Sequence, residues 1–378
     1  MAALKKIKVL ECIRQGQIGG GETHLLSLVK NIDKTIFEPV VLSFTDGPMI
    51  EQLKEMGIKT FIINSLKPFD FRVWKKVSAV LIRENIKIIH CHGTRATSNV
   101  FRPASKLSIP LVYTIHGWSF HNDQKPLIKK IRIWGEQFLT SKSSVNIAVS
   151  KSNMLSGKKV IPALKAIVIN NGIDQEKFNP ALEFKDIRTE VGVDKNAVLI
   201  IFIARFTSHK QPLSLINAFA KSLKYKPSLQ LLMVGEGDDK SEALEMAKKL
   251  GINNNIHFLP FRQDVPDLLA AADIFVLPSL WEGLPIGLLE AMSMGKAVIA
   301  TRVDGTSEII QDKQNGLLIE TQNLVDDLTN AISILSGDEN MRKQLGKNAI
   351  ETVRKNFNAA SMTRKIEKVY TDILEVNN

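Results

Sequence analysis

The sequence has few of the features that mark secreted, membrane-spanning or disulfide-stapled proteins. Among 378 residues there are two cysteines, Cys12 and Cys91, and both fall in apolar, strand-like runs. Buried free thiols are therefore expected, and such usage fits a reducing compartment. The longest apolar run, Ala197 to Ala204, is far shorter than the roughly 18 residues that indicate a membrane span. The opening MAALKKIKVL also lacks the apolar stretch of a signal peptide, so we expect a cytoplasmic protein.

Signatures of metal and cofactor binding are also missing. There is no Asp-x-Asp motif, and no histidines and cysteines follow one another at the spacing of metal ligands. The one glycine-rich turn has neither the dinucleotide-binding spacing nor the Lys-Ser/Thr of a phosphate-binding loop. We expect no metal, no cofactor and no nucleic-acid partner, and the oligomeric state stays open.

What the sequence does hold is an uneven charge. Residues 1–180 contain 27 Lys and Arg against 13 Asp and Glu, a net charge of +14, whereas residues 181–378 carry −3. This asymmetry favours an anionic surface or substrate for the first half, although a solvated basic surface explains it equally well.

Short apolar strands alternate with amphipathic helices along the whole chain. The strands are rich in Val and Ile and read as continuous apolar runs, which is typical of a parallel sheet covered by helices on both faces. Alternation at this spacing predicts doubly wound, Rossmann-like α/β architecture. Two series of strands are expected, at 7–13, 39–44, 60–64, 86–90, 111–116 and 145–149, and then at 198–204, 230–234, 256–259, 274–277, 297–300 and 316–319.

The two series predict two domains that face each other across a cleft. Residues 1–171 form the first, residues 172–184 the linker, and residues 185–359 the second. Helix 360–378 ends the chain with an apolar stripe of Ile366, Val369, Tyr370 and Ile373, which could pack on either domain, and we expect it to pack on the first.

Three segments at predicted strand ends carry the candidate chemistry. QIGGGE, residues 17–22, follows the first strand and opens a helix, so its glycines and free amides suit a phosphate. ARFTSHK, residues 204–210, places Arg205 and Lys210 after the first strand of the second domain, where doubly wound sheets bind ligands. Both cations can neutralise a diphosphate. Each segment also has a purely structural interpretation, as a turn or a basic loop tip.

The third segment, LPSLWEGLPIGLLEAMSMGKAVIAT at residues 277–301, is the strongest signal. Pro285 reads as an early helix position that leaves the amides of residues 286–288 free for an anion. Glu282 precedes this helix and Glu290 lies just over a turn inside it. A carboxylate can accept hydrogen bonds from two vicinal hydroxyls, as in ribose or a hexose. An acidic loop residue and a surface helix residue are the alternatives.

Here the sequence resembles a known family. EGLPIGLLEAMSMGKAVIA is similar to the Glu, seven residues, Glu signature of the family 4 retaining glycosyltransferases. IGGGETHLLSLV, VYTIHG, NIAVSKS, VINNGIDQEKFNP, ARFTSHKQPLSLINAF and VDGTSEIIQDKQNGLLI resemble further family segments in the expected order. The resemblance spans nearly the whole chain and implies a GT-B fold, with the acceptor on the first domain and the nucleotide-sugar on the second.

The resemblance also implies roles for individual residues. Arg205 and Lys210 would hold the diphosphate and stabilise the leaving nucleotide, while Glu282 would bind the transferred sugar and Glu290 the ribose. His116, which ends a strand before Gly117, would reach the sugar near the reacting carbon. The remaining donor contacts implied by the family are Gly20 and Gly21 from the first domain, Gly235, Gly237 and Arg262 near the base, and Gly283, Leu284, Pro285, Ile286, Gly287 and Leu288 at the sugar and phosphates.

The resemblance implies transfer of a sugar from a nucleotide-sugar, with UDP-sugars favoured over GDP-mannose, to a saccharide or lipid-linked acceptor in cell-surface glycan synthesis. An epimerase or hydrolase of the same fold, or a non-catalytic sugar-nucleotide-binding subunit, stays open. In KPLIKKIRIWGEQF, residues 125–138, Ile128, Ile131 and Trp134 share a helical face flanked by basic residues. This predicts either peripheral association with an anionic inner membrane face or an ordinary domain helix.

Overall fold

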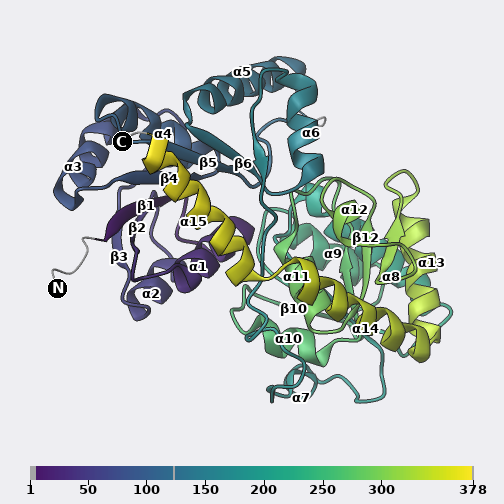
Figure 1. The fold of residues 1–378 in the computed structure, drawn as a ribbon. Coiled ribbons are helices and arrows are strands. Elements are labelled where there is room, and N and C mark those ends of the chain that lie inside the picture. The colour runs from purple at the N-terminus through teal and green to yellow at the C-terminus, as the bar shows by residue number, and fades with distance from the viewer. Residues whose placement is uncertain (1–5, 122–123, 377–378) are drawn as a thin grey trace. The chain divides into compact units, whose positions relative to one another are not determined.

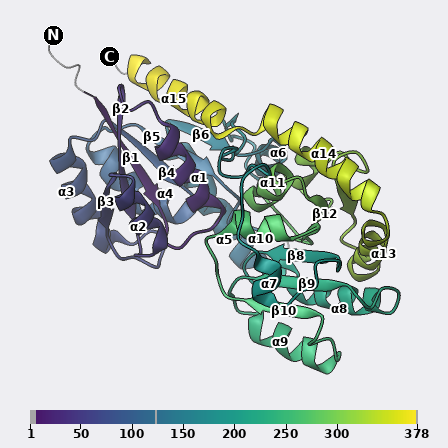
Figure 2. The same ribbon diagram turned by 90° about the horizontal axis from the view of Figure 1, so that it is seen from below.

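The computed structural model describes residues 6–121 and 124–376, and the chain divides into two compact units. The first unit comprises residues 1–172 and 359–378, and the second comprises residues 173–358. Each unit contains one parallel sheet with helices on both faces (Figures 1 and 2). The predicted α/β class is confirmed in both halves of the chain.

The sheet of the first unit has the strand order β3-β2-β1-β4-β5-β6-β7. Its strands are β1 (Ile7–Ile13), β2 (Phe37–Ser43), β3 (Lys59–Ile62), β4 (Ile88–His92), β5 (Leu111–Ile115), β6 (Val145–Ala148) and β7 (Ile167–Val168). Its helices are α1 (Gly20–Asn31), α2 (Pro48–Glu55), the 3-10 helix η1 (Phe71–Val73), α3 (Trp74–Glu84), α4 (Thr94–Lys106), α5 (Pro126–Lys142), α6 (Lys151–Val160) and α15 (Ala359–Val376).

Alternation along the strands divides this unit into two apolar layers, because successive side chains point to opposite faces. Leu10 and Cys12 of β1 pack under α3 and α4, whereas Val9 packs with residues of α1 and α15. The stripe Ile366, Val369, Tyr370 and Ile373 is buried in this second layer. The C-terminal helix therefore belongs to the first unit and lies beside α1 in both views (Figures 1 and 2).

The sheet of the second unit has the order β10-β9-β8-β11-β12-β13. Its strands are β8 (Leu199–Ile203), β9 (Gln230–Val234), β10 (Ile256–Leu259), β11 (Ile274–Leu277), β12 (Ala297–Thr301) and β13 (Leu317–Ile319). Its helices are α7 (Ile187–Val191), the 3-10 helix η2 (Ser208–Lys210), α8 (Pro212–Leu223), α9 (Lys240–Lys249), α10 (Val265–Ala271), α11 (Ile286–Ser293), α12 (Thr306–Ile309), α13 (Leu324–Gly337) and α14 (Glu339–Asn356).

The segment expected to be a linker packs against the second unit. Ile173 bridges to Asn358, Phe178 is buried, and the hydroxyl of Ser293 donates to the carbonyl of Phe178 at 2.8 Å. Glycine, proline and asparagine break the helix and strand periodicities here, but they do not prevent packing. A chain segment without regular structure can therefore still be an integral part of a domain.

Candidate functional site

Two loops of the second unit meet at the carboxyl ends of β8 and β11. Leu280 N–H donates to the carbonyl of His209 at 2.8 Å, and the His209 ring stacks on Trp281 at a centroid distance of 4.1 Å. Lys210 forms an ion pair with Glu282, and both side chains are largely buried. The structure thus brings together Lys210 and Glu282, which are 72 positions apart in the sequence.

Helix α11 begins directly after this junction. Pro285 is its N-cap rather than a helical residue, and its carbonyl accepts from the Leu289 amide at 3.3 Å. The first helical residues are Ile286 and Gly287, so the positive end of the helix dipole starts here. Amides in the first turn have no acceptor within the helix, which makes this end suitable for a phosphate or a sugar oxygen.

Glycines shape the loop that carries Arg205. Gly235 and Gly237 have positive φ angles of 143° and 155°. A Cβ on Gly235 would lie 2.1 Å from the carbonyl oxygen of Ala204, and a Cβ on Gly237 would lie 2.2 Å from that of Phe206. The backbone on both sides of Arg205 therefore packs at a distance that only glycine permits. Whether these glycines also contact a base stays a prediction.

Glu290 lies on the second turn of α11 in a partly buried position. Burial raises the pKa of its carboxyl to about 7, although the positive charge of Lys177 opposes this shift. Hydrogen bonds from two hydroxyl groups of a ligand would stabilise the ionised form of this carboxyl, which burial disfavours.

Arg262, expected near the base, is engaged by carboxylates of its own unit. Its Nε donates to Asp264 at 2.9 Å, and its terminal nitrogens bind Asp264 and Glu190. These partners raise the pKa of Arg262 above its usual value. The structure thus places Arg262 in a clamp between α7 and the loop after β10, and its contact with a base stays a prediction.

In the first unit, the predicted residues meet around His116, which directly follows β5. Gly20 and Gly21 are the first residues of α1, and a Cβ on Gly21 would lie 3.5 Å from Cδ2 of His116. His116 Nε2 is 3.0 Å from Nδ1 of His92. Burial, followed by the neighbouring His24, lowers the pKa of His116 well below its usual value.

Several polar residues around His116 were not recognised as site candidates in the sequence. Glu11 is fully buried, its Oε2 lies 2.9 Å from His92 Nε2, and its Oε1 accepts from the Tyr370 hydroxyl at 2.8 Å. His24 lies with its ring edge-on to His116, and its Nδ1 is 2.9 Å from Asn171 Oδ1. The signal that could have revealed them is a lone glutamate within the apolar strand IKVLECI, beside the alternating histidines of IIHCH.

These side chains form two groups compact enough to hold a metal ion. The ligand atoms within each group lie within 4.8 Å of one another, and the groups are His24, His92 and His116, and Glu11, His90 and His92. Sequence spacing gave no sign of either group, because their members come from β1, α1, β4 and the end of β5. The expectation that no metal is bound stays a prediction.

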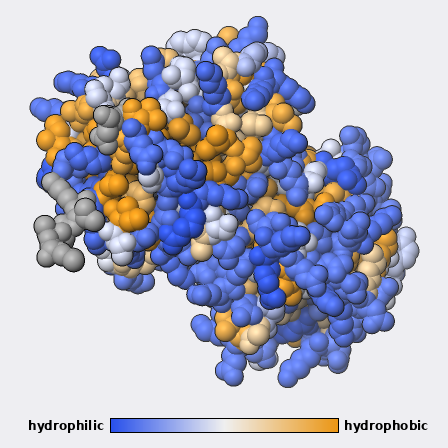
Figure 3. Space-filling model, viewed as in Figure 1, coloured by the Kyte–Doolittle hydropathy of each residue, from blue (hydrophilic) through white to orange (hydrophobic). Residues whose placement is uncertain are grey.

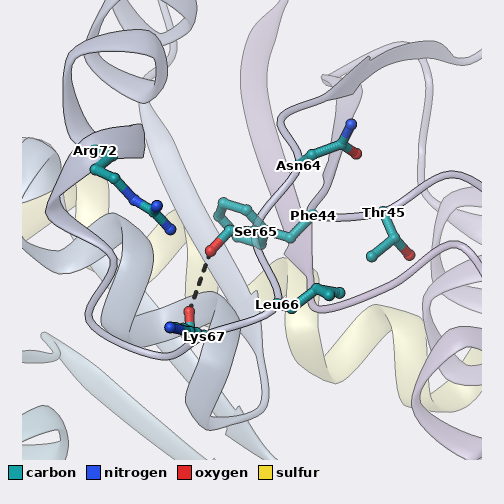
Figure 4. A pocket seen from close by; sticks show the side chains of 7 residues that line it. All are labelled: Phe44, Thr45, Asn64, Ser65, Leu66, Lys67 and Arg72. Carbon is teal, nitrogen blue, oxygen red and sulfur yellow. Dashed lines mark hydrogen bonds between the residues drawn. The ribbon is translucent and has the colours of Figure 1, made fainter.

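A cavity of about 460 Å³ lies at the carboxyl ends of β2 and β3 (Figure 4). Lys67 and Arg72 line it, and the Arg72 guanidinium is fixed on Asp70 by hydrogen bonds of 2.7 and 2.8 Å. Thr45, another lining residue, accepts at 3.1 Å from the amide of Gly16. The cavity thus borders the loop that leads into the glycine-rich start of α1.

Helix α5 presents apolar side chains to solvent. Ile128, Ile131 and Trp134 are 44%, 60% and 68% exposed. Basic residues surround them on the same helix, among them Lys130 and Arg132. On the face shown in Figure 3, hydrophobic surface gathers over the first unit, while the second unit is largely hydrophilic. No helix within residues 6–121 and 124–376 is long and apolar enough to cross a membrane.

Comparison with known proteins decides the family. The model of glycosyl transferases group 1 matches residues 183–352, and that of glycosyltransferase family 4 matches residues 18–177. The chain is a GT-B glycosyltransferase of the family 4 type. The family resemblance stated from the sequence is thereby confirmed, apart from the retaining stereochemistry.

Individual relatives of this glycosyltransferase are distant but cover it well. It is 26% identical to the UDP-Gal:alpha-D-GlcNAc-diphosphoundecaprenol alpha-1,3-galactosyltransferase of Escherichia coli, over 98% of each chain. It is 28% identical to the N-acetyl-alpha-D-glucosaminyl L-malate synthase of Bacillus anthracis, over 85% of this chain and 84% of that one. The crystal structure of Anabaena HepE with UDP-glucose has a TM-score of 0.86 at 23% identity, covering 97% and 100% of the two chains.

Proposed function

We propose that this glycosyltransferase transfers a sugar from a UDP-sugar to a saccharide or lipid-linked acceptor with retention of the anomeric configuration. The observation that carries the proposal is the junction of the Arg205–Lys210 loop with Glu282 and the start of α11. It brings Lys210 to Glu282 beside the start of α11, on a loop that also carries Arg205, where doubly wound sheets bind ligands. GDP-mannose is the competing donor.

This junction supplies what a diphosphate leaving group requires. When the bond between the anomeric carbon and the phosphate oxygen breaks, negative charge develops on the phosphate. Arg205, Lys210 and the first amides of α11 would stabilise that charge in the transition state. The ion pair with Glu282 holds the flexible Lys210 side chain at the site before the donor arrives.

Retention is proposed through attack on the face from which the phosphate leaves. The departing phosphate oxygen accepts the proton of the acceptor hydroxyl, so no side chain has to act as a nucleophile. Glu282 binds hydroxyls of the transferred sugar and Glu290 binds those of the ribose. Sugar contacts by Gly20, Gly21 and His116 are also part of the proposal, as the family resemblance implies.

UDP is favoured because the names of similar proteins mention it. The Escherichia coli relative is named as using UDP-Gal, and HepE was crystallised with UDP-glucose. The acceptor is less constrained, since one relative is named for a diphosphoundecaprenol-linked sugar and the other for L-malate. We favour a lipid-linked acceptor in cell-surface glycan synthesis because the exposed apolar and basic residues of α5 suit an anionic membrane surface. That placement puts the protein at the cytoplasmic face of the membrane.

The test combines binding with product analysis. A thermal-shift screen across UDP-, GDP- and CDP-sugars should select one nucleotide, and that donor is then incubated with sugar and lipid-linked acceptors. A glycosylated product with retained configuration supports the proposal. An epimerised sugar or free sugar formed without an acceptor would instead identify an epimerase or a hydrolase.

A further inference from the structure

A continuous hydrogen-bonded chain runs through the first unit from the C-terminal helix to His116. The Tyr370 hydroxyl donates to Oε1 of Glu11 at 2.8 Å, and Oε2 of Glu11 lies 2.9 Å from Nε2 of His92. Nδ1 of His92 then lies 3.0 Å from Nε2 of His116. The chain links α15, β1, β4 and the end of β5, and Glu11, His92 and Tyr370 are buried.

Sheet register places these side chains together. Glu11 in β1 is the Cα partner of His90 in β4, and His92 is the partner of Thr114 in β5. Because side chains two positions apart share a face, Glu11, His92 and His116 follow one another across neighbouring strands on the face covered by α1 and α15.

The protons of the chain can be assigned from the ionisation state of Glu11. Burial would raise the pKa of Glu11, but His90 and His92 outweigh this effect and hold it well below its usual range. The side chain is therefore an ionised carboxylate, which only accepts hydrogen bonds. Tyr370 and His92 must both donate to it, so the ring proton of neutral His92 is on Nε2.

The proton position on His92 determines the proton position on His116. Burial and the neighbouring His90 lower the pKa of His92 to about 4, so at neutral pH this ring has one proton and its Nδ1 carries a lone pair. The Nε2 of His116 must donate to that lone pair. His116 is also neutral, and its single proton is thereby used, which leaves its Nδ1 as an acceptor.

The nearby His24 does not change this assignment. Its Nδ1 is engaged with Asn171 at 2.9 Å, and burial lowers its pKa to about 3, so it brings no positive charge to His116. Its ring packs edge-on against His116 at a centroid distance of 4.8 Å. This contact packs the two rings together, and the buried Nε2 of His24 makes no hydrogen bond within the described residues.

We propose that Glu11 and His92 are positioning residues that fix His116 in its Nε2–H tautomer and present its Nδ1 to a hydroxyl of the sugar substrate. The substrate part rests on the proposed function, whereas the tautomer part rests on the hydrogen-bonded chain alone. Stability gives little reason for the arrangement, because buried charged groups can often be replaced by apolar residues without loss. A carboxylate that orients a histidine is an established way to set which ring nitrogen acts on a substrate.

The test reads the tautomer directly. Protein labelled with 15N in histidine is examined by long-range 1H–15N correlation NMR, and the His116→Gln variant identifies the His116 signals. Wild-type protein should show a proton on Nε2 and an unprotonated Nδ1. A proton on Nδ1 of His116 would overturn the proposal.

Two variants at His92 separate positioning from folding. His92→Leu removes the acceptor, so His116 should lose its fixed tautomer and kcat should fall about ten- to a hundredfold with the donor KM little changed. His92→Asn offers an amide oxygen near the position of Nδ1 and should restore the tautomer and most of kcat. Equal melting temperatures in the two variants exclude unfolding as the cause. An unchanged His116 tautomer and kcat in His92→Leu would refute the positioning role.

Further arms distinguish the remaining outcomes. Ring nitrogens of His24, His92 and His116 lie within 4.8 Å of one another, so a Zn²⁺ ion could bind between these three side chains. If EDTA alters the wild-type spectrum, a metal ion fixes His116 and the proposal is wrong. The NMR measurement needs no substrate, so an inactive protein whose tautomer still depends on His92 would count against the proposed function and support the positioning role.

Discussion

The partly buried Glu290 predicts a pH dependence of nucleotide binding. Burial raises the pKa of its carboxyl to about 7, against a usual value near 4. If the ribose hydroxyls donate to this group, the ionised form binds and the protonated form binds poorly. With a pKa of about 7, roughly 90% of the protein is ionised at pH 8 and roughly 10% at pH 6. If the protonated form binds about tenfold more weakly, affinity should therefore fall about fivefold from pH 8 to pH 6.

The dissociation constant of the nucleoside diphosphate chosen by the thermal-shift screen is measured by isothermal titration calorimetry at pH 6, 7 and 8. The terminal phosphate of the ligand also titrates in this range, so the wild type is compared with Glu290→Gln. The amide has no titration, and the ratio of the two dissociation constants isolates the carboxylate. That ratio should be about twofold at pH 6 and about tenfold at pH 8, since one hydrogen bond to a charged group contributes about 1.5 kcal/mol.

Lys177 provides an independent control, since its positive charge lowers the pKa of Glu290. In Lys177→Gln the midpoint of the ratio should move to higher pH. If the wild type and Glu290→Gln show the same pH dependence, or if wild-type affinity rises as pH falls, Glu290 does not bind ribose as a carboxylate.

Three further predictions address the leaving group, the glycine loop and the membrane. Lys210→Ala should lower kcat about a hundredfold in steady-state assays, the scale of removing one donor to a developing charge, and near-normal turnover would contradict the leaving-group role. Gly237→Ala should destabilise the protein by about 2 kcal/mol or more in urea unfolding, because its Cβ would meet the Phe206 carbonyl oxygen at a positive φ. Gly337→Ala, at the end of α13 with no atom near the added Cβ, should change stability little and serves as control. Ile131→Ser with Trp134→Ser should lose sedimentation with anionic liposomes while keeping its melting temperature, and equal recovery of wild type and variant in the supernatant would remove the membrane proposal.

Local sequence patterns predicted most of the fold because each element has a clear periodicity. Strands β1, β9, β10 and β11 have the predicted bounds, the other predicted strands differ by one or two residues at an end, and β7 was not predicted. Some of these differences arose where apolar residues, such as Phe44 after β2 and Ile63 after β3, continue past the end of the strand. In IKIIHCH the polar histidines belong to the strand, although they read as its end, because their polar atoms are satisfied inside the unit.

The sequence by itself determined the alternation of strands and helices, the two sheets and the family. It also predicted site roles for Arg205, Lys210, Glu282 and Glu290, since strand ends and helix starts are local features and a family motif implies the roles. The tertiary structure decided what depends on residues distant in the chain: the pairing of Lys210 with Glu282, the burial that raises the pKa of Glu290, and the partners of His116. The chain from Tyr370 to His116 joins residues up to 359 positions apart, and only sheet register and helix packing could bring them together.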